Sequence, residues 1–237
     1  MPASDDALVH RVAHAIASGI TVEAGDGSAA IATDSQRLDA LLRDGDRAGG
    51  WRLWTNRQCL VTTRRFAVTP RFADAALAST RRGWPVFVRG SGGTTVAHRP
   101  GILNASYFEA WRGDGDEVTR RFRIFCEHLA ASIRSVGVST GLGHVHGSYC
   151  DGSLNLVSGG QKLAGTASLV RRRGDYIGLL CHASIGVTGH VAADVEAIER
   201  FEAELGFRPL YSEDVHTTLE QRLMSAFAGV SCRAGRA

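Results

Sequence analysis

The chain has 237 residues, with 44% hydrophobic and 22% charged residues and a formal net charge of +3. A disordered chain is far more polar, so this composition indicates a folded globular protein, and the length suits one large α/β domain with a substantial core. The mild positive charge does not indicate nucleic acid as a partner, and no run of eighteen apolar residues is present to span a membrane.

The first fifty residues predict a helical N-terminal segment. Apolar residues within 1–17 are spaced like one face of a helix, and 35–42 is a second helical pattern inside the Gly-, Ala- and Asp-rich stretch 19–50. The segment lacks the positive region and apolar run of a signal peptide. The five cysteines are odd in number and widely spaced, which favours a reducing compartment over a disulfide framework. We therefore expect a cytoplasmic protein.

From Trp51 onward, short apolar and β-branched runs alternate with helical patterns and glycine-containing turns, as in an α/β domain. The strands that we expect cover residues 51–54, 59–63, 85–89, 101–107, 154–157, 162–170 and 176–187. The helices that we expect in this part cover residues 72–82, 117–133, 192–205 and 215–227. Short turns separate the last three strands, so we expect them to form antiparallel hairpins.

Lys162 is the only lysine of the chain, and the other 26 of the 27 basic residues are arginines. A general preference for arginine explains part of this imbalance. An ammonium is nevertheless a compact charge with three donors, which guanidinium does not replace where several oxygens converge. Small residues flank Lys162 and leave room for a ligand. We therefore predict that Lys162 belongs to the functional site, although a solvated lysine at a strand end is the simpler alternative.

A glycine-rich turn, residues 90–95, directly follows the expected strand 85–89. Glycine lets backbone N–H groups approach an anion closely, so this turn is a candidate site for a phosphate or a carboxylate. The turn matches neither the P-loop pattern nor the dinucleotide-binding pattern. By itself the glycine pair is as typical of a tight turn as of a binding loop.

Two motifs in this chain resemble those of the lipoate protein ligase A and octanoyltransferase family. Residues 88–104 read Val-Arg-Gly-Ser-Gly-Gly-Thr-Thr-Val-Ala-His-Arg-Pro-Gly-Ile-Leu-Asn, similar to the family's signature loop and the strand after it. Residues 160–167 read Gly-Gln-Lys-Leu-Ala-Gly-Thr-Ala, similar to the family's Gly-Arg-Lys-Ile-Ala-Gly-Ser-Ala. Two motifs in order are more specific than either alone, and Lys162 falls on the family's essential lysine.

The resemblance implies an α/β (α+β) fold of the biotin/lipoate protein ligase type, with a mixed sheet flanked by helices, as in class II aminoacyl synthetases. It also implies an enzyme that uses ATP and Mg²⁺ to make an acyl-adenylate and attaches a lipoyl or octanoyl group to a lysine of an acceptor domain. We expect one catalytic domain over residues 1–237. No separate C-terminal accessory domain is expected, so an accessory subunit is a possible partner.

The resemblance assigns a role to each residue that matches the family pattern. Lys162 would lie between the phosphate and the carbonyl oxygen of the adenylate and stabilise both electrostatically. The residues expected to bind the substrate are Arg89, Ser91, Gly92, Gly93, Thr94, His98, Asn104, Gly165, Thr166 and Ala167. Asp151 is expected near Mg²⁺. The chain departs from the family at Val88, Thr94 and Ser168, where an arginine, a glycine and a glutamine are usual, and this weakens the expectation of nucleotide binding.

Cys150 supports a second hypothesis. It lies twelve residues before Lys162, and some octanoyltransferases of this fold carry a nucleophilic cysteine ahead of the corresponding lysine. A thiolate beside an ammonium holds an acyl group as a thioester, which needs no ATP; the donor would then be an octanoyl-loaded acyl carrier protein. A small buried cysteine, a metal site of Cys150 with His144 and His146, and an inactive binding module of this fold are the remaining alternatives.

Overall fold

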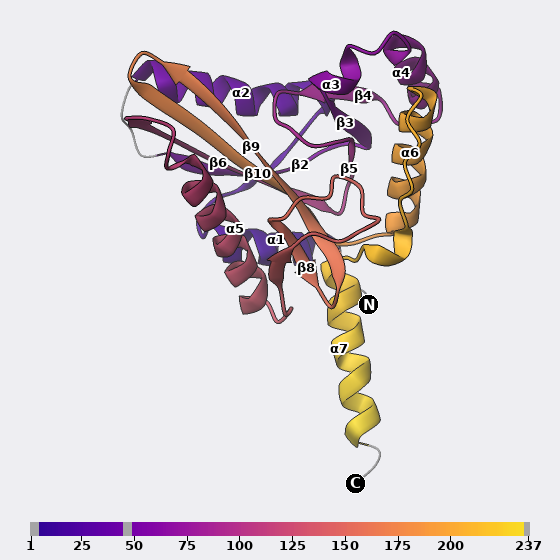
Figure 1. The fold of residues 1–237 in the computed structure, drawn as a ribbon. Coiled ribbons are helices and arrows are strands. Elements are labelled where there is room, and N and C mark those ends of the chain that lie inside the picture. Colours follow the sequence, from indigo (N-terminus) through magenta and orange to yellow (C-terminus); the bar gives the residue numbers. More distant parts are fainter. Residues whose placement is uncertain (1–4, 45–48, 235–237) are drawn as a thin grey trace.

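The structure, a computed structural model, describes residues 5–44 and 49–234 and has a mixed α/β architecture (Figure 1). A large sheet of seven strands runs in the order β1 (Val22–Ala24), β2 (Gly50–Thr55), β6 (Ile102–Arg112), β10 (Tyr176–Gly186), β9 (Gln161–Arg173), β8 (Asn155–Ser158) and β7 (Gly141–Gly143). A small sheet of three strands runs in the order β4 (Val86–Arg89), β3 (Cys59–Thr63) and β5 (Val96–His98). This mixed architecture confirms the predicted fold class.

Helices cover both faces of the large sheet (Figure 1). α1 (Asp5–Ile16) and α5 (Val118–Ser135) pack together on one face, and α2 (Gly27–Asp44) packs on β6 and β10 from the other. Neighbouring side chains of a strand point to opposite faces, so Leu179 joins the core under α1 and α5 while Leu180 joins the cluster under α2. Within the described ranges, no helix combines the length and apolar character needed to cross a bilayer.

The small sheet has its own helices and its own core. α3 (Arg64–Ala67), α4 (Phe72–Arg81) and α6 (Val191–Glu204) surround it, with Leu60, Ile198 and Phe201 fully buried between them. The carboxyl end of β4 leads into the glycine-rich turn and then into β5. Both ends of that turn are therefore anchored in strands of the small sheet.

The last three long strands form the antiparallel meander that the sequence predicts. β8 pairs with β9, and β9 pairs with β10 from Arg173↔Tyr176 to Ala164↔Ile185. The two-residue turn between β9 and β10 begins with Gly174 at φ 58°, a left-handed conformation that glycine adopts without strain. This hairpin carries Lys162 and the second family motif into the middle of the molecule.

The N-terminal segment differs from the prediction in two ways. α2 spans eighteen residues, from Gly27 to Asp44, rather than 35–42, and β1 was not predicted. The first turn of α2 reads Gly-Ser-Ala-Ala, which resembles loop composition, but in the structure a Cβ on Gly27 would lie 2.9 Å from the Phe87 ring of β4 and Ala30 is buried. Residues 1–4 and 45–48 of the predicted segment lie outside the described residues.

The C-terminal helix also begins later than predicted. A short 3₁₀ helix covers Glu213–Val215, and α7 then runs over Leu219–Ala234 instead of 215–227. The start is fixed by a reciprocal cap: the Gln221 backbone N–H donates to Thr218 Oγ1 and the Thr218 N–H donates to Gln221 Oε1, at 3.3 and 3.0 Å. α7 extends away from the body of the molecule (Figure 1).

Candidate active site

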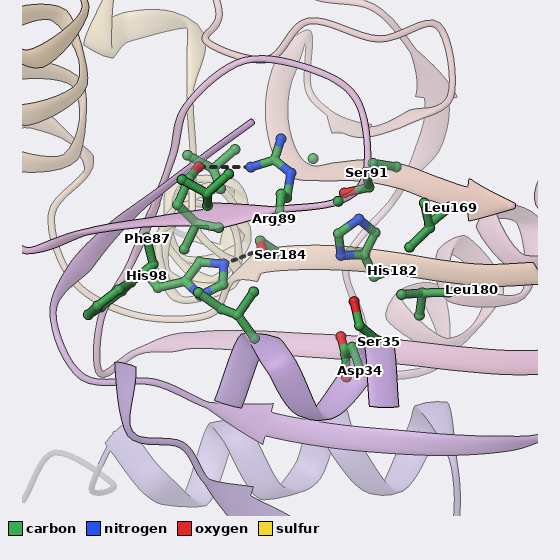
Figure 2. A pocket seen from close by; sticks show the side chains of 18 of the residues that line it. Asp34, Ser35, Phe87, Arg89, Ser91, His98, Leu169, Leu180, His182 and Ser184 are labelled. Atoms are coloured by element: carbon green, nitrogen blue, oxygen red, sulfur yellow. Dashed lines mark hydrogen bonds between the residues drawn. The ribbon is translucent and has the colours of Figure 1, made fainter. Parts of the chain in front are cut away.

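A cavity of about 370 Å³ lies between α2, β4, β9 and β10 (Figure 2). Most of its wall is apolar, and its lining includes Ile31, Trp54, Val61, Phe87, Val96, Leu169 and Leu180. Polar side chains are few and come from different elements; they include Asp34, Arg89, Ser91, His98, His182 and Ser184. A mostly apolar cavity with a few convergent polar groups is typical of a site for an apolar small molecule or acyl chain. We call it the acyl cavity.

Cys150 lies at the wall of the acyl cavity, in the loop between β7 and β8. Its backbone has φ 49°, and no other non-glycine residue of the described chain has a positive φ. Hydrogen bonds hold this conformation from both sides. The Cys150 N–H donates to Thr94 Oγ1 at 3.0 Å, and the Cys150 carbonyl accepts from Asn155 Nδ2 at 3.0 Å and Lys162 Nζ at 2.8 Å. A left-handed non-glycine residue held this firmly is typical of a functional position.

Arg89 stands at the end of β4 and is almost fully buried. Its Nη1 donates to the Val61 carbonyl at 2.8 Å, and its Nη2 donates to the carbonyls of Gly92 and Thr94 at 3.0 and 2.8 Å. These hydrogen bonds hold the glycine-rich turn around the guanidinium. Its Nη2 also lies 3.9 Å from Cys150 Sγ, which links the first family motif to the cysteine.

Gly93 is the point where the turn approaches the cysteine most closely. Its φ is 97°, and a Cβ at this position would lie 2.6 Å from Cys150 Sγ and 3.1 Å from Arg89 Nη2. Gly92, in contrast, has open space around it. The glycine that the structure requires is thus the second of the pair.

Lys162 is buried, and its ammonium points to the Cys150 loop rather than into the acyl cavity. Nζ donates to the carbonyls of Tyr149 and Cys150 and lies 4.8 Å from the centre of the Tyr149 ring. Burial lowers the pKa of Lys162 to about 8. The sequence prediction placed Lys162 at the site, and the structure brings it to the backbone of the candidate nucleophile.

Lys162 borders a second, much smaller space of about 30 Å³. The Tyr149 ring stacks on the His216 ring at 4.5 Å between centroids and fills the region next to the ammonium. A volume near 30 Å³ corresponds to about one water molecule. The two spaces meet at Val96, Gly165 and Ser184, which line both.

His98 takes part in a polar chain at the edge of the acyl cavity. Ser184 Oγ donates to Asn104 Oδ1 at 2.7 Å, so His98 Nε2, 3.2 Å from the same hydroxyl, must be its donor. Burial, with Arg89 and His182 nearby, lowers the pKa of His98 to about 3. His98 and Asn104 thus position Ser184, which reaches the cavity.

The other predicted site residues divide into two groups. Ser91, Gly165, Thr166 and Ala167 line the acyl cavity, and the buried Ser91 Oγ has no hydrogen-bond partner among the described residues. Asp151, the expected Mg²⁺ ligand, instead accepts from the Val145 N–H at 2.8 Å. Within residues 5–44 and 49–234 no group of three His, Cys, Asp or Glu side chains is arranged to hold a metal, and His144 and His146 are exposed while Cys150 is buried.

Sequence reasoning missed the contribution of α2 and β10 to this cavity. Asp34 of α2 is buried at the cavity wall, where it pairs with Arg52 at 2.7 Å and accepts from Ser106. His182 of β10 also lines the cavity, and burial lowers its pKa to about 3. The signal in the sequence was a single Asp on the apolar face of a helix rich in small residues. Its role became clear only when the structure showed its partner, Arg52 on β2.

The sequence pattern of the family described as the lipoyl protein ligase A/B catalytic domain matches residues 26–200. The match covers most of the chain, both motifs, the acyl cavity and the Cys150 loop. The chain belongs to this family.

Two curated relatives of this chain carry the same name. The chain is 39% identical over 123 residues to an octanoyl-GcvH:protein N-octanoyltransferase of Kyrpidia tusciae, covering 51% of this chain and 42% of the relative. It is 32% identical over 156 residues to the protein of that name from Geobacillus kaustophilus, covering 65% and 53%. The matched stretches thus span about half the length of these curated relatives.

Solved structures support the fold. A lipoate-protein ligase A bound with ATP superposes with a TM-score of 0.62 at 16% identity, covering 85% of this chain and 76% of that one. The putative lipoate protein ligase Ta0514 of T. acidophilum with bound lipoic acid gives a TM-score of 0.60 at 17% identity, with the same coverage. These likenesses confirm the predicted ligase-type fold.

The immediate surroundings of Lys162 leave little room for the phosphate of an acyl-adenylate. The space that Lys162 lines measures about 30 Å³, and a wider open space of about 470 Å³ shares Val191, His216 and Thr217 with it. Nζ already donates to two carbonyls and faces an aromatic ring, so two of its three N–H donors are engaged. Asp151 is likewise engaged with the backbone of its own loop.

Proposed function

We propose that this protein is an acyltransferase that moves an octanoyl group from one lipoyl-acceptor protein to a lysine of another through a thioester on Cys150. The observation that carries the proposal is the position of Cys150: its sulfur borders an apolar cavity of about 370 Å³ and contacts a buried guanidinium. The names of the relatives, which specify octanoyl transfer from GcvH, support the same reaction class.

The reaction proceeds in two balanced steps. The Cys150 thiolate attacks the carbonyl carbon of the octanoyl-lysine amide, the C–S bond forms, and the C–N bond breaks as the lysine amine leaves with a proton. The amine of the acceptor lysine then attacks the thioester, the new C–N bond forms, and the thiolate leaves while the amine loses a proton to solvent. One amide is exchanged for another, so no nucleotide is consumed.

The chain's own residues have distinct tasks in this proposal. The acyl cavity holds the alkyl chain, and burial of each methylene contributes about 0.8 kcal/mol to binding. Lys162 and Asn155 fix the Cys150 carbonyl, and Thr94 fixes its N–H, so the sulfur keeps one position at the cavity wall. A nucleophile held in place in this way avoids the entropic cost of ordering it during the reaction.

The decisive experiment incubates the protein with an acceptor domain and one of three donors: octanoyl-GcvH, octanoyl acyl carrier protein, or lipoate with ATP·Mg²⁺. Intact mass spectrometry then weighs both proteins. We expect the first donor to load one octanoyl group on the enzyme and then on the acceptor, and Cys150→Ala to lose both products. Modification only in the arm with lipoate and ATP would establish a ligase instead. No modification in any arm would indicate a binding module without transfer activity. Cys181→Ala, a buried cysteine away from the cavity, is the matched control.

A further inference from the structure

Three cationic side chains are buried in the described part of the chain: Arg52, Arg89 and Lys162. Arg52 pairs with Asp34 and Glu23 at 2.7 Å. Neither Arg89 nor Lys162 has a carboxylate within ion-pair distance among the described residues. A buried charge without an opposite charge is costly and is retained where an anion forms or binds. Both unpaired cations contact the same residue, Cys150.

The two cations reach different atoms of Cys150. Lys162 Nζ is bound to the backbone carbonyl oxygen, so it acts on the conformation of the loop. Arg89 Nη2 is the group at the sulfur, 3.9 Å from Sγ, and Sγ has no other hydrogen-bond partner among the described residues. His98 and His182, which also line the acyl cavity, are neutral because burial lowers the pKa of each to about 3, so neither supplies a positive charge.

Gly93 brings the turn against this pair and leaves no space between them. A Cβ on Gly93 would lie 2.6 Å from Sγ and 3.1 Å from Nη2. The turn therefore covers the sulfur and the guanidinium on one side, and both groups are buried. In such a low-dielectric setting a charge pair at about 4 Å interacts several times more strongly than in water.

We propose that Arg89 is the counter-ion of the Cys150 thiolate, and therefore the group that prepares the nucleophile for attack. The proposal rests on the proposed function and adds a residue role to it. When the thiol ionises, its proton passes to solvent and the guanidinium stays protonated throughout. When the C–S bond forms, the negative charge leaves the sulfur for the carbonyl oxygen, and it returns to the sulfur, beside Arg89, when the C–S bond breaks. Arg89 thus stabilises the thiolate both as nucleophile and as leaving group.

The test measures alkylation of Cys150 by iodoacetamide and needs no acyl donor. The rate at pH 7 is followed on the Cys150 peptide by mass spectrometry in the full-length protein. We expect Arg89→Gln to slow alkylation by about 10- to 100-fold. Arg89→Lys, which keeps the charge, should recover most of the rate. Arg82→Gln breaks a partly exposed ion pair with Glu204 far from the cavity and is expected to leave the rate unchanged.

A purely structural role for Arg89 predicts a different result. In that case Arg89→Lys, which loses the fork that binds three carbonyls, would be as impaired as Arg89→Gln. Equal alkylation rates in Arg89→Gln and the wild type would overturn the proposal. If Arg89→Gln does not fold, Arg89→Lys and the wild type are compared with the anionic reagent iodoacetate. A preference for iodoacetate over iodoacetamide no greater than that of free cysteine would then count against a cationic sulfur site. Transfer activity in Cys150→Ala would refute the proposed function and would not affect the alkylation result.

Discussion

The acyl cavity and the small space beside Lys162 share lining residues but differ in every property that decides what each can hold. The first is about 370 Å³, mostly apolar, and borders Cys150; the second is about 30 Å³, and the stacked rings of Tyr149 and His216 line it. One structural neighbour is an ATP-bound ligase, whereas this chain has room for an acyl chain beside Cys150 and a space of about 30 Å³ next to Lys162. This difference supports the thioester route that we propose.

Cys150 and Lys162 thus have separate environments although they are hydrogen-bonded to each other. The sulfur faces the large space and the ammonium faces the small one. Lys162 bonds to the backbone carbonyl of Cys150, whereas Arg89 Nη2 lies 3.9 Å from its sulfur. In the proposals above, Lys162 therefore positions the nucleophile and Arg89 stabilises its charge.

The largest expected effect is acid destabilisation, because both spaces bury neutral histidines. His98 and His182 line the acyl cavity with pKa values of about 3, and burial lowers the pKa of His216, beside the small space, to about 4. A free imidazole has a pKa near 6.5, so as the pH falls below this value the unfolded chain binds protons first and the folded state loses stability. Each histidine lowers the free energy of unfolding by up to about 1.4 kcal/mol for every pH unit that the pH falls from 6.5 toward the pKa of the folded state.

Urea unfolding at pH 7.5 and pH 5.0 measures this effect. We expect a much lower midpoint at pH 5.0, and a smaller difference between the two pH values in His182→Gln. The exposed His190→Gln is the matched control and should keep the full pH dependence. A midpoint that does not change between the two pH values would show that the three rings are not neutral in the folded protein.

The second prediction removes the ammonium beside the small space. Lys162→Met leaves the Cys150 carbonyl with Asn155 alone, so the sulfur loses its fixed position. A displacement of about 1 Å at a nucleophile costs about 10²-fold in rate, and we expect octanoyl transfer to fall by at least this factor. Stability should change little, because the substitution also removes a buried unpaired charge. Single-turnover acyl transfer and thermal unfolding test both parts; transfer at the wild-type rate would exclude the positioning role.

Much of this arrangement follows from local sequence. The strands of residues 51–187 alternate regularly, and the two motifs identify the turn around Arg89 and the strand around Lys162. The extent of α2 was not predictable, because its Gly-Ser-Ala-Ala start is typical of loops and helix formation depends on packing against β6 and β10. The small space was not predictable either, since it depends on Tyr149 contacting His216, 67 residues further along the chain.

The third prediction concerns the glycine pair where the turn meets the acyl cavity. Gly93→Ala forces a side chain into a left-handed position, which costs about 1–2 kcal/mol, and adds a contact at 2.6 Å from Cys150 Sγ. We expect a loss of about 2 kcal/mol or more in the free energy of unfolding and slower alkylation of Cys150. Gly92→Ala enters open space and is the matched control. Equal unfolding free energies and equal alkylation rates in the two variants would mean that the turn does not pack tightly against the sulfur.

The smallest expected effect concerns acyl-chain length in the large space alone. Leu169 lines the acyl cavity and packs near Gly90, and Leu169→Val removes one methylene from the wall. One methylene of additional apolar contact is worth about 0.8 kcal/mol, or about fourfold in binding, so the preference for octanoyl over decanoyl donors should fall by up to this factor. Competition between the two donors, read by the mass of the acceptor, measures the ratio. Val170→Ala changes the exposed neighbour on the same strand and should leave the ratio unchanged, because its side chain points to the other face.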